Sequence, residues 1–161
     1  MRIYIESTIP SYVVARPARD LIQATHQQLT RDWWDFQREK HEPFTSQLVL
    51  DEIARGEVEM AQRRLSLLAD VTLLESTEEA RELTRSIMDS GLLPAKAEGD
   101  AAHIALATVH EMDILLTWNC RHIANAAILG RLRKLVAKQN HTLPEIYTPA
   151  ELMGTNYEQN D

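Results

Sequence analysis

The stretch Arg2-Ile3-Tyr4-Ile5-Glu6-Ser7-Thr8 opens the chain with an apolar run that stops on a carboxylate followed by two hydroxyls. β-Branched and aromatic residues favour a pleated strand, so the run before Glu6 is predicted to form one. Pro10 lacks an N–H group and is expected to prevent a helix from running unbroken through Thr8 and Ile9. Ligands of open α/β sheets gather at the carboxyl ends of strands, which makes Glu6 a site candidate. A helix cap or a solvated turn acid is the alternative interpretation of this residue.

The length of 161 residues predicts one domain, over residues 1–153, followed by a loose polar tail at 154–161. Hydrophobic residues make up 44% of the chain and charged residues 25%, as in ordinary globular proteins. The single cysteine, Cys120, excludes an intrachain disulfide and favours a reducing compartment. Because no apolar run is long enough to span a membrane and the chain opens directly into a strand, we expect a cytoplasmic protein without a signal peptide.

The formal net charge is −7, from 17 Lys and Arg against 24 Asp and Glu. This balance argues against a protein that coats nucleic acid, since such binding needs a surplus of cations. It leaves open a nuclease whose metal ion supplies the local positive charge, and it suits a partner with a basic segment.

Strands and helices are predicted to alternate along the whole chain. After the first strand, further strands are expected at 44–45, 71–74, 114–117 and 145–148. A short helix or turn at 7–15 is followed by helices at 18–40, 47–55, 57–69, 77–90, 95–111 and 124–139, and a last turn begins at Pro149. Ser46 is the expected cap of the helix at 47–55, and Ser76 with Glu79 forms a capping box for the helix at 77–90. The alternation predicts an α/β fold whose parallel sheet is covered by helices on both faces.

The helix expected at 18–40 carries one apolar stripe. Ile22, Leu29, Trp33 and Phe36 recur at helical spacing, which predicts that they face the core. Trp34 lies about 100° from Trp33 around the helix, where it either contacts a partner or widens the core stripe.

Two further acids are predicted to point inward from helices. Glu52 shares a helix face with Leu48 and Val49. Its neighbour Asp51 falls instead on the face with Gln47 and Arg55, where an Asp–Arg pair in solvent is expected. Asp100 shares a face with His103 near the start of a nearly apolar helix, although an acid there also suits the helix dipole.

Glu6, Glu52 and Asp100 would repel one another if they converged, unless a divalent cation neutralised them. Oxygen ligands of this kind suit Mg²⁺ or Mn²⁺. Asn119, just past the strand at 114–117, offers an amide oxygen to the same site, or it caps the turn that follows.

Four short motifs occur in order along the chain: Ile3-Tyr4-Ile5-Glu6-Ser7-Thr8, Ser46-Gln47-Leu48-Val49-Leu50-Asp51-Glu52-Ile53, Asp100-Ala101-Ala102-His103-Ile104-Ala105 and Leu115-Leu116-Thr117-Trp118-Asn119. In these motifs, which extend over nearly the whole chain, the protein resembles a PIN domain of the VapC toxin type. The resemblance implies a three-layer α/β/α fold with a parallel sheet of about five strands. It also implies a Mg²⁺- or Mn²⁺-dependent endoribonuclease whose carboxylates hold the metal and activate a water against an RNA phosphodiester. A homodimer and a small antitoxin partner are expected on the same ground.

The resemblance assigns roles to individual residues. Glu6, Glu52 and Asp100 match three acidic positions and would be the metal ligands, while Asn119 stands at the fourth catalytic position. Three supporting residues complete the set, namely the hydroxyls of Ser7 and Thr8 and the structural His103 of an Asp-x-x-His turn.

Two departures from the family pattern favour an alternative function. The first acid is normally Asp, and Glu6 is one methylene longer; Asn119 lacks the charge of the usual fourth acid. A catalytically weak or inactive PIN-like binding or scaffold protein is therefore the second hypothesis. Phosphatase chemistry is a distant third, because it needs an Asp-x-Asp motif where this chain has Glu6-Ser7-Thr8.

Other residues are weaker candidates. His122 follows Asn119 by one short turn and either faces the site or is a core histidine. The cations that would contact the substrate are expected from Arg16, Arg19, Lys96 and Arg121.

Overall fold

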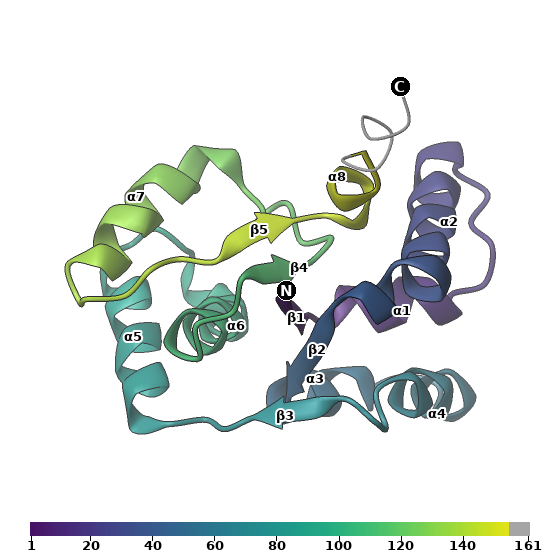
Figure 1. Ribbon diagram of the computed structural model, residues 1–161, viewed down its shortest axis with the longest axis horizontal. Coiled ribbons are helices and arrows are strands. Elements are labelled where there is room, and N and C mark those ends of the chain that lie inside the picture. Colours follow the sequence, from purple (N-terminus) through teal and green to yellow (C-terminus); the bar gives the residue numbers. More distant parts are fainter. Residues whose placement is uncertain (155–161) are drawn as a thin grey trace.

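A central sheet of five parallel strands organises the protein, in the order β3-β2-β1-β4-β5 (Figure 1). The computed structural model describes residues 1–154. The strands are β1 (Arg2–Ile5), β2 (Glu42–Ser46), β3 (Thr72–Leu74), β4 (Ile114–Leu116) and β5 (Glu145–Tyr147). The predicted fold class, an α/β protein with a parallel sheet of about five strands, is confirmed.

The strand order reverses at β1. This strand pairs with β2 on one side and with β4 on the other; Ile3, for example, lies opposite both Pro43 and Ile114. In doubly wound sheets, ligands bind outside the carboxyl ends of the strands at such a switch point. The residues that follow β1 and β4 are therefore placed where a site is expected.

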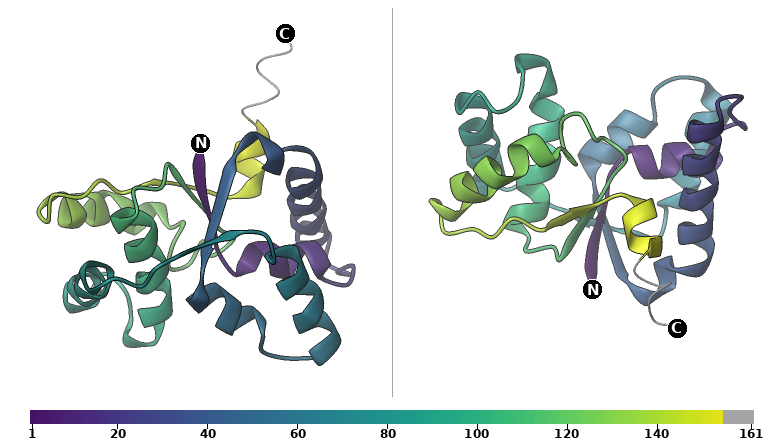
Figure 2. Two further views of the ribbon diagram at one scale, coloured as in Figure 1. Left: turned by 60° about the horizontal axis from the view of Figure 1, so that its bottom comes forward. Right: turned by 90° about the horizontal axis from the view of Figure 1, so that it is seen from above.

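Helices cover both faces of the sheet (Figure 1). Helices α5, α6 and α7 lie on one side, and α1, α2 and α4 lie on the other, an arrangement that the two views of Figure 2 also show. The helices are α1 (Thr8–Val14), α2 (Leu21–Phe36), α3 (Gln47–Ile53), α4 (Val58–Leu67), α5 (Glu78–Asp89), α6 (Glu98–Val109), α7 (Ala126–Ala137) and α8 (Pro149–Gly154), with short 3-10 turns η1 (Arg38–Lys40) and η2 (Ala95–Ala97). The layers match the three-layer α/β/α expectation.

The core lies on both sides of the central strands. In β1 and β4, Ile3, Ile5, Leu115 and Leu116 are fully buried, because a parallel sheet covered on both faces leaves no solvent side. Helix α6 is also buried over most of its second half, as its nearly apolar sequence predicts.

The start of α1 corrects one prediction. Pro10 does not interrupt a helix, because α1 begins at Thr8 and continues through Pro10. Proline is tolerated there, since the first N–H groups of a helix have no partner within it.

The helix caps correct another detail. Ser46 caps α3 as predicted, accepting a hydrogen bond from the N–H of Val49. For α5, however, the cap is Thr77, whose hydroxyl accepts from the N–H of Ala80, so the predicted capping box at Ser76 is displaced by one residue.

The apolar stripe predicted for α2 is largely wrong. Trp33 is fully buried, but Ile22 and Phe36 are about 70% exposed. The buried face instead contains Gln27 and Thr30, whose polar groups are satisfied by main-chain atoms of the neighbouring loop and of α2 itself. Local periodicity cannot detect such a face, because tertiary partners make its polar groups suitable for burial.

The end of the chain extends α8 to Gly154, and the rest of the predicted tail, residues 155–161, lies outside the described part. Within residues 1–154, no helix is long and apolar enough to cross a membrane.

Candidate metal centre

Glu6 follows β1 directly, and its side chain is 3% exposed. One carboxylate oxygen, Oε2, accepts three hydrogen bonds: from the N–H of Thr8 at 3.0 Å, from the hydroxyl of Thr8 at 2.5 Å, and from the hydroxyl of Thr117 at 2.8 Å. Among residues 1–154, no donor contacts the other oxygen, Oε1. Glu6 therefore fastens the start of α1 to the end of β4 with one oxygen and leaves the second for another ligand.

Glu52 reaches the same place from α3. Its Oε2 accepts the hydroxyl hydrogen of Ser7 at 2.5 Å, and its Oε1 lies 2.9 Å from Nε2 of His103. Because an ionised carboxylate only accepts hydrogen bonds, Nε2 of His103 is the donor. The orientation of Glu52 is thus determined by groups from two other elements, and the side chain stays 25% exposed.

His103 is held on its other side by Tyr4 of β1. The Tyr4 hydroxyl lies 2.8 Å from Nδ1 of His103 and 2.7 Å from the hydroxyl of Ser46. Burial raises the pKa of the Tyr4 hydroxyl, which therefore stays protonated. Three buried residues, Ser46, Tyr4 and His103, are linked by hydrogen bonds and hold the half-buried carboxylate of Glu52 from the interior.

The pKa shifts of Glu52 and His103 follow from this geometry. Burial by itself would lower the pKa of His103, but the hydrogen bond to Glu52 and the charges of Glu6, Glu52 and Asp100 outweigh it and raise that pKa. Burial would raise the pKa of Glu52, yet the hydrogen bond and charge of His103 and the hydroxyl of Ser7 lower it. His103 thus stabilises Glu52 in its ionised form.

These shifts predict the pH dependence of the stability of the metal-free protein. Because folding raises the pKa of His103, the ring contributes fully to the free energy of unfolding below its ordinary pKa of 6.5. This contribution is lost as the pH rises through the pKa of His103 in the folded protein. Since the pKa of Glu52 is lowered, its contribution is complete above the ordinary value of 4.5 and is lost as pH falls. The pair should therefore contribute most between these two ordinary values.

Urea unfolding at a series of pH values, in EDTA, measures this effect. The free energy of unfolding of the wild type should fall more steeply above pH 6.5 than that of His103→Gln, which lacks the titrating ring. Equal slopes for the two proteins would contradict the assignment.

Glu6, Glu52 and His103 form the tightest group of potential metal ligands: one ligand atom from each lies within 4.8 Å of the others. Because Nε2 of His103 donates its hydrogen to Glu52, the ring holds a ligand rather than acting as one. The two carboxylates offer oxygen donors of the kind that suits Mg²⁺ or Mn²⁺.

Asp100 stands next to this group but outside it. Its Oδ1 accepts a hydrogen bond from the side-chain amide of Asn119 at 3.0 Å, and its Oδ2 lies 2.9 Å from Nδ1 of His122. Asn119 in turn donates its backbone N–H to the hydroxyl of Thr117, which bonds Glu6. A continuous series of hydrogen bonds therefore links Asp100 to Glu6 across the end of β4.

The structure thus brings Glu6 and Glu52 together with the supporting residues Ser7, Thr8 and His103, and it places Asp100 and Asn119 beside them. Three residues that support the site were not predicted as site residues. Thr117 contacts Glu6 directly, whereas Tyr4 contacts His103 and Ser46 contacts Tyr4. His122 was left open. Tyr4 carried one signal: a tyrosine in a buried strand needs a partner for its hydroxyl.

Trp118, between Thr117 and Asn119, fixes the position of the loop that follows β4. Its backbone N–H donates to the hydroxyl of Thr8, its indole N–H donates to Thr30, and its ring stacks on His26 with the ring centroids 4.1 Å apart. These contacts fasten the loop after β4 to α1 and α2.

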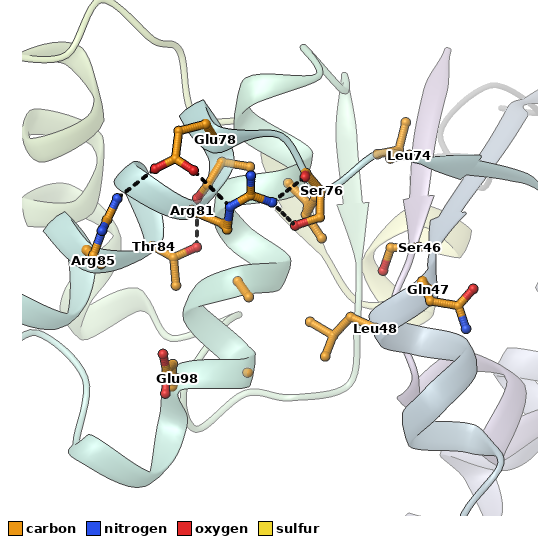
Figure 3. Close-up of a pocket in the computed structure, with 14 residues that line it drawn as sticks. Ser46, Gln47, Leu48, Leu74, Ser76, Glu78, Arg81, Thr84, Arg85 and Glu98 are labelled. Atoms are coloured by element: carbon orange, nitrogen blue, oxygen red, sulfur yellow. Dashed lines mark hydrogen bonds and ion pairs between the residues drawn. The ribbon is translucent and has the colours of Figure 1, made fainter.

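A cavity of about 630 Å³ lies beside the centre, between α3, α5 and α6 (Figure 3). Leu48 and Leu74 contribute apolar wall, while Arg81 and Arg85 both pair with Glu78 on α5. Gly99 also lines it, and a Cβ on Gly99 would stand 3.6 Å from Oε1 of Glu52. The cavity therefore reaches the backbone next to the centre, but the carboxylates of Glu6, Glu52 and Asp100 do not line it.

No protein-family model matches the chain, and no curated protein matches it either. Among solved structures, the chain is similar to VapBC2 from Rickettsia felis bound to a DNA fragment from their promoter. The match covers 92% of this chain and 98% of that chain, with a TM-score of 0.58 and 14% sequence identity.

The protein is thus an α/β protein with a switch-point site lined by carboxylates. Its fold is that of a VapC-like PIN domain, as the four sequence motifs predicted.

Proposed function

We propose that this protein is a Mg²⁺- or Mn²⁺-dependent endoribonuclease that hydrolyses RNA phosphodiester bonds, and that it is the toxin of a VapC-like toxin–antitoxin pair. The observation that carries this proposal is the position of the carboxylates. Glu6 and Glu52 converge at the carboxyl end of β1, at the switch point of a VapC-like PIN fold, and Asp100 is linked to them by hydrogen bonds.

Glu6, Glu52 and Asp100 would hold the metal ion. Glu6 offers Oε1, because its Oε2 is occupied by three donors, and Glu52 offers an oxygen whose direction Ser7 and His103 determine. When bound, the ion supplies the means to ionise a water and to stabilise negative charge on the phosphate oxygens.

The chain's own contribution is preorganisation. Glu6 and Glu52 are oriented by hydroxyl donors, and Glu52 also by His103, so these two carboxylates need little rearrangement when an ion arrives. Asp100, outside this closest group, is oriented by an amide and a histidine. The hydrogen bond and charge of His103 lower the pKa of Glu52, which holds this carboxylate in the ionised form that a metal ligand needs.

The partners follow from the same proposal. We propose an antitoxin protein and a homodimer; the similar solved structure is a VapBC2 complex on promoter DNA, which supports the antitoxin. Of the cations proposed for RNA, Arg19, Lys96 and Arg121 are exposed, while Arg16 is also exposed but lies 3.3 Å from Glu57 in an ion pair.

A PIN-like binding or scaffold protein is the second candidate. It is favoured by Asn119, whose amide is used within the fold, and by the hydrogen bonds that occupy Oε2 of Glu6. In this case the carboxylates would stabilise the fold and would not bind metal.

A cleavage assay with a metal titration separates the two functions. We expect the wild type to cut members of a panel of structured and single-stranded RNAs at about millimolar Mn²⁺, in the usual range for oxygen-ligand sites of weak affinity. EDTA should abolish the cleavage and added Mn²⁺ should restore it, because the ion supplies the essential charge.

The control is the Glu6→Gln and Glu52→Gln double variant, purified in the same way, which reveals any contaminating ribonuclease. If the wild type cuts no RNA of the panel, or cuts equally well in EDTA, the proposed nuclease is excluded.

A further inference from the structure

Two side chains of the loop after β4 contact the same carboxylate. Asn119 and His122 each contact Asp100, one on either oxygen of the carboxylate. In the family pattern the position of Asn119 carries an acid, so the loop replaces a negative charge with two hydrogen-bond donors.

The amide of Asn119 has one possible orientation. Its Oδ1 accepts the backbone N–H of His122 at 3.0 Å, and its Nδ2 donates to Oδ1 of Asp100 at 3.0 Å. A flipped amide would place an oxygen against the carboxylate and an NH₂ against an N–H, which removes both bonds. Both ends of the side chain therefore take part in hydrogen bonds within the fold.

The tautomer of His122 follows in the same way. Nδ1 lies 2.9 Å from Oδ2 of Asp100, and a carboxylate can only accept, so Nδ1 carries a hydrogen. The ring is 16% exposed, which means that the fold rather than solvent holds it in place. Asp100 thus receives one N–H on each oxygen, from two residues of a single turn.

This arrangement determines what Asp100 offers to a metal. Each carboxylate oxygen has two lone-pair directions in its plane, so one direction remains on each after the two donors are counted. The two donors also prevent the carboxylate from rotating about its Cβ–Cγ bond. Asp100 therefore presents its remaining lone pairs in a defined direction.

We propose that Asn119 and His122 are positioning residues that hold Asp100 as a ligand for a single divalent ion. An acid in place of Asn119 would set two carboxylates side by side, and such a pair needs additional positive charge to remain ionised. An amide and an imidazole N–H remove that need. This inference rests on the proposed metal site and explains how the site works without the fourth acid.

The test is calorimetric titration of Mn²⁺ into the full chain, which does not depend on RNA cleavage. The wild type should bind one Mn²⁺ per chain. His122→Ala should weaken this binding by about tenfold, the lower end of the effect of losing a residue that orients a metal ligand. His122→Asn should restore most of the loss, because its Nδ2 takes the place of Nδ1.

Asn119→Asp tests the stoichiometry. This variant should bind a second Mn²⁺ per chain, since the new carboxylate beside Asp100 requires another cation. The matched control is Gln139→Glu, which adds the same charge at an exposed position after α7 and should leave one Mn²⁺ bound.

Each outcome bears on a different claim. Two Mn²⁺ per wild-type chain, or equal affinity in His122→Ala and the wild type, would overturn the positioning role even if RNA is cleaved. One Mn²⁺ with the expected variant effects but no RNA cleavage would support this inference and exclude the nuclease. A wild type that binds no Mn²⁺ would overturn both.

Discussion

Replacing Glu52 with Gln is expected to reduce Mn²⁺-dependent RNA cleavage by at least about 100-fold. A bound ion stabilises transition-state charge by several kcal/mol, and each 1.4 kcal/mol corresponds to about a factor of ten in rate. The glutamine side chain would keep the hydrogen bonds, because its oxygen accepts from His103 and its NH₂ donates to the hydroxyl of Ser7. The change therefore removes the charge that holds the ion and leaves the packing in place.

Initial rates over a range of Mn²⁺ concentrations measure the effect, and urea unfolding verifies that the variant is folded. The matched control is Asp51→Asn, the adjacent acid, which is exposed. Among residues 1–154 it accepts a hydrogen bond only from Gln47, on the outer face of α3. Asp51→Asn should cleave at the wild-type rate. Comparable losses in both variants, or wild-type cleavage by Glu52→Gln, would show that Glu52 is not a metal ligand.

Replacing Trp33 with Ala is expected to lower the free energy of unfolding by about 3–5 kcal/mol, the usual cost of deleting a large aromatic side chain from a core. The side chain is fully buried, and its ring lies against both Trp34 and His41, at centroid distances of 6.4 and 6.0 Å. The deletion would leave a cavity beside Trp34 and His41. Urea unfolding followed by circular dichroism measures the loss.

Two further variants make this prediction specific. Trp34 is only partly buried, with the guanidinium of Arg38 over its ring at 4.6 Å, so Trp34→Ala should cost clearly less. The indole nitrogen of Trp33 has no hydrogen-bond partner among residues 1–154, so Trp33→Phe should be far milder than Trp33→Ala. A larger loss in Trp34→Ala than in Trp33→Ala would refute the assignment of the buried face.

The carboxylate of Glu6 joins two neighbouring segments of the chain. It reaches the N–H and hydroxyl of Thr8 and, across the sheet, the hydroxyl of Thr117. Glu6 was interpreted either as a cap of the following turn or as a site acid, and the two interpretations are compatible. Oε2 accepts the N–H of Thr8 as a cap does, and Oε1 remains for a ligand. Asn119 is similar: it accepts the N–H of His122 as a turn cap does, and it also contacts Asp100.

Much of the site could be anticipated from local pattern. An acid at the end of a β-branched strand, and an acid on the apolar face of a short helix, are positions that chain geometry assigns without knowledge of distant residues. The contacts of these acids could not be anticipated in the same way. Ser7 and Glu52 are 45 residues apart, and Tyr4 and His103 are 99 apart. Their contacts depend on which strands are neighbours, and many strand orders are compatible with the same alternation of strands and helices.

The buried face of α2 shows that local sequence also fails to predict which side chains are packed inside. Ile22 and Phe36 follow the helical period but are exposed, whereas Gln27 and Thr30 break it and are buried. Periodicity measures only the hydrophobicity of side chains. Burial also depends on whether a polar group finds a partner, and for Gln27 that partner is the loop at Arg16 and Ala18.

Local sequence was sufficient for the alternation of elements, the parallel α/β class and the acid at the end of the first strand, because these follow from the period of apolar residues and the chemistry of turns. The donors that hold each carboxylate are instead a property of the tertiary structure. The fold places His103 behind Glu52 and His122 beside Asp100, and it directs the side-chain N–H of Asn119 to Asp100. The reason is that a hydrogen bond requires its two atoms to be about 3 Å apart, and only the order of the strands brings such distant residues together.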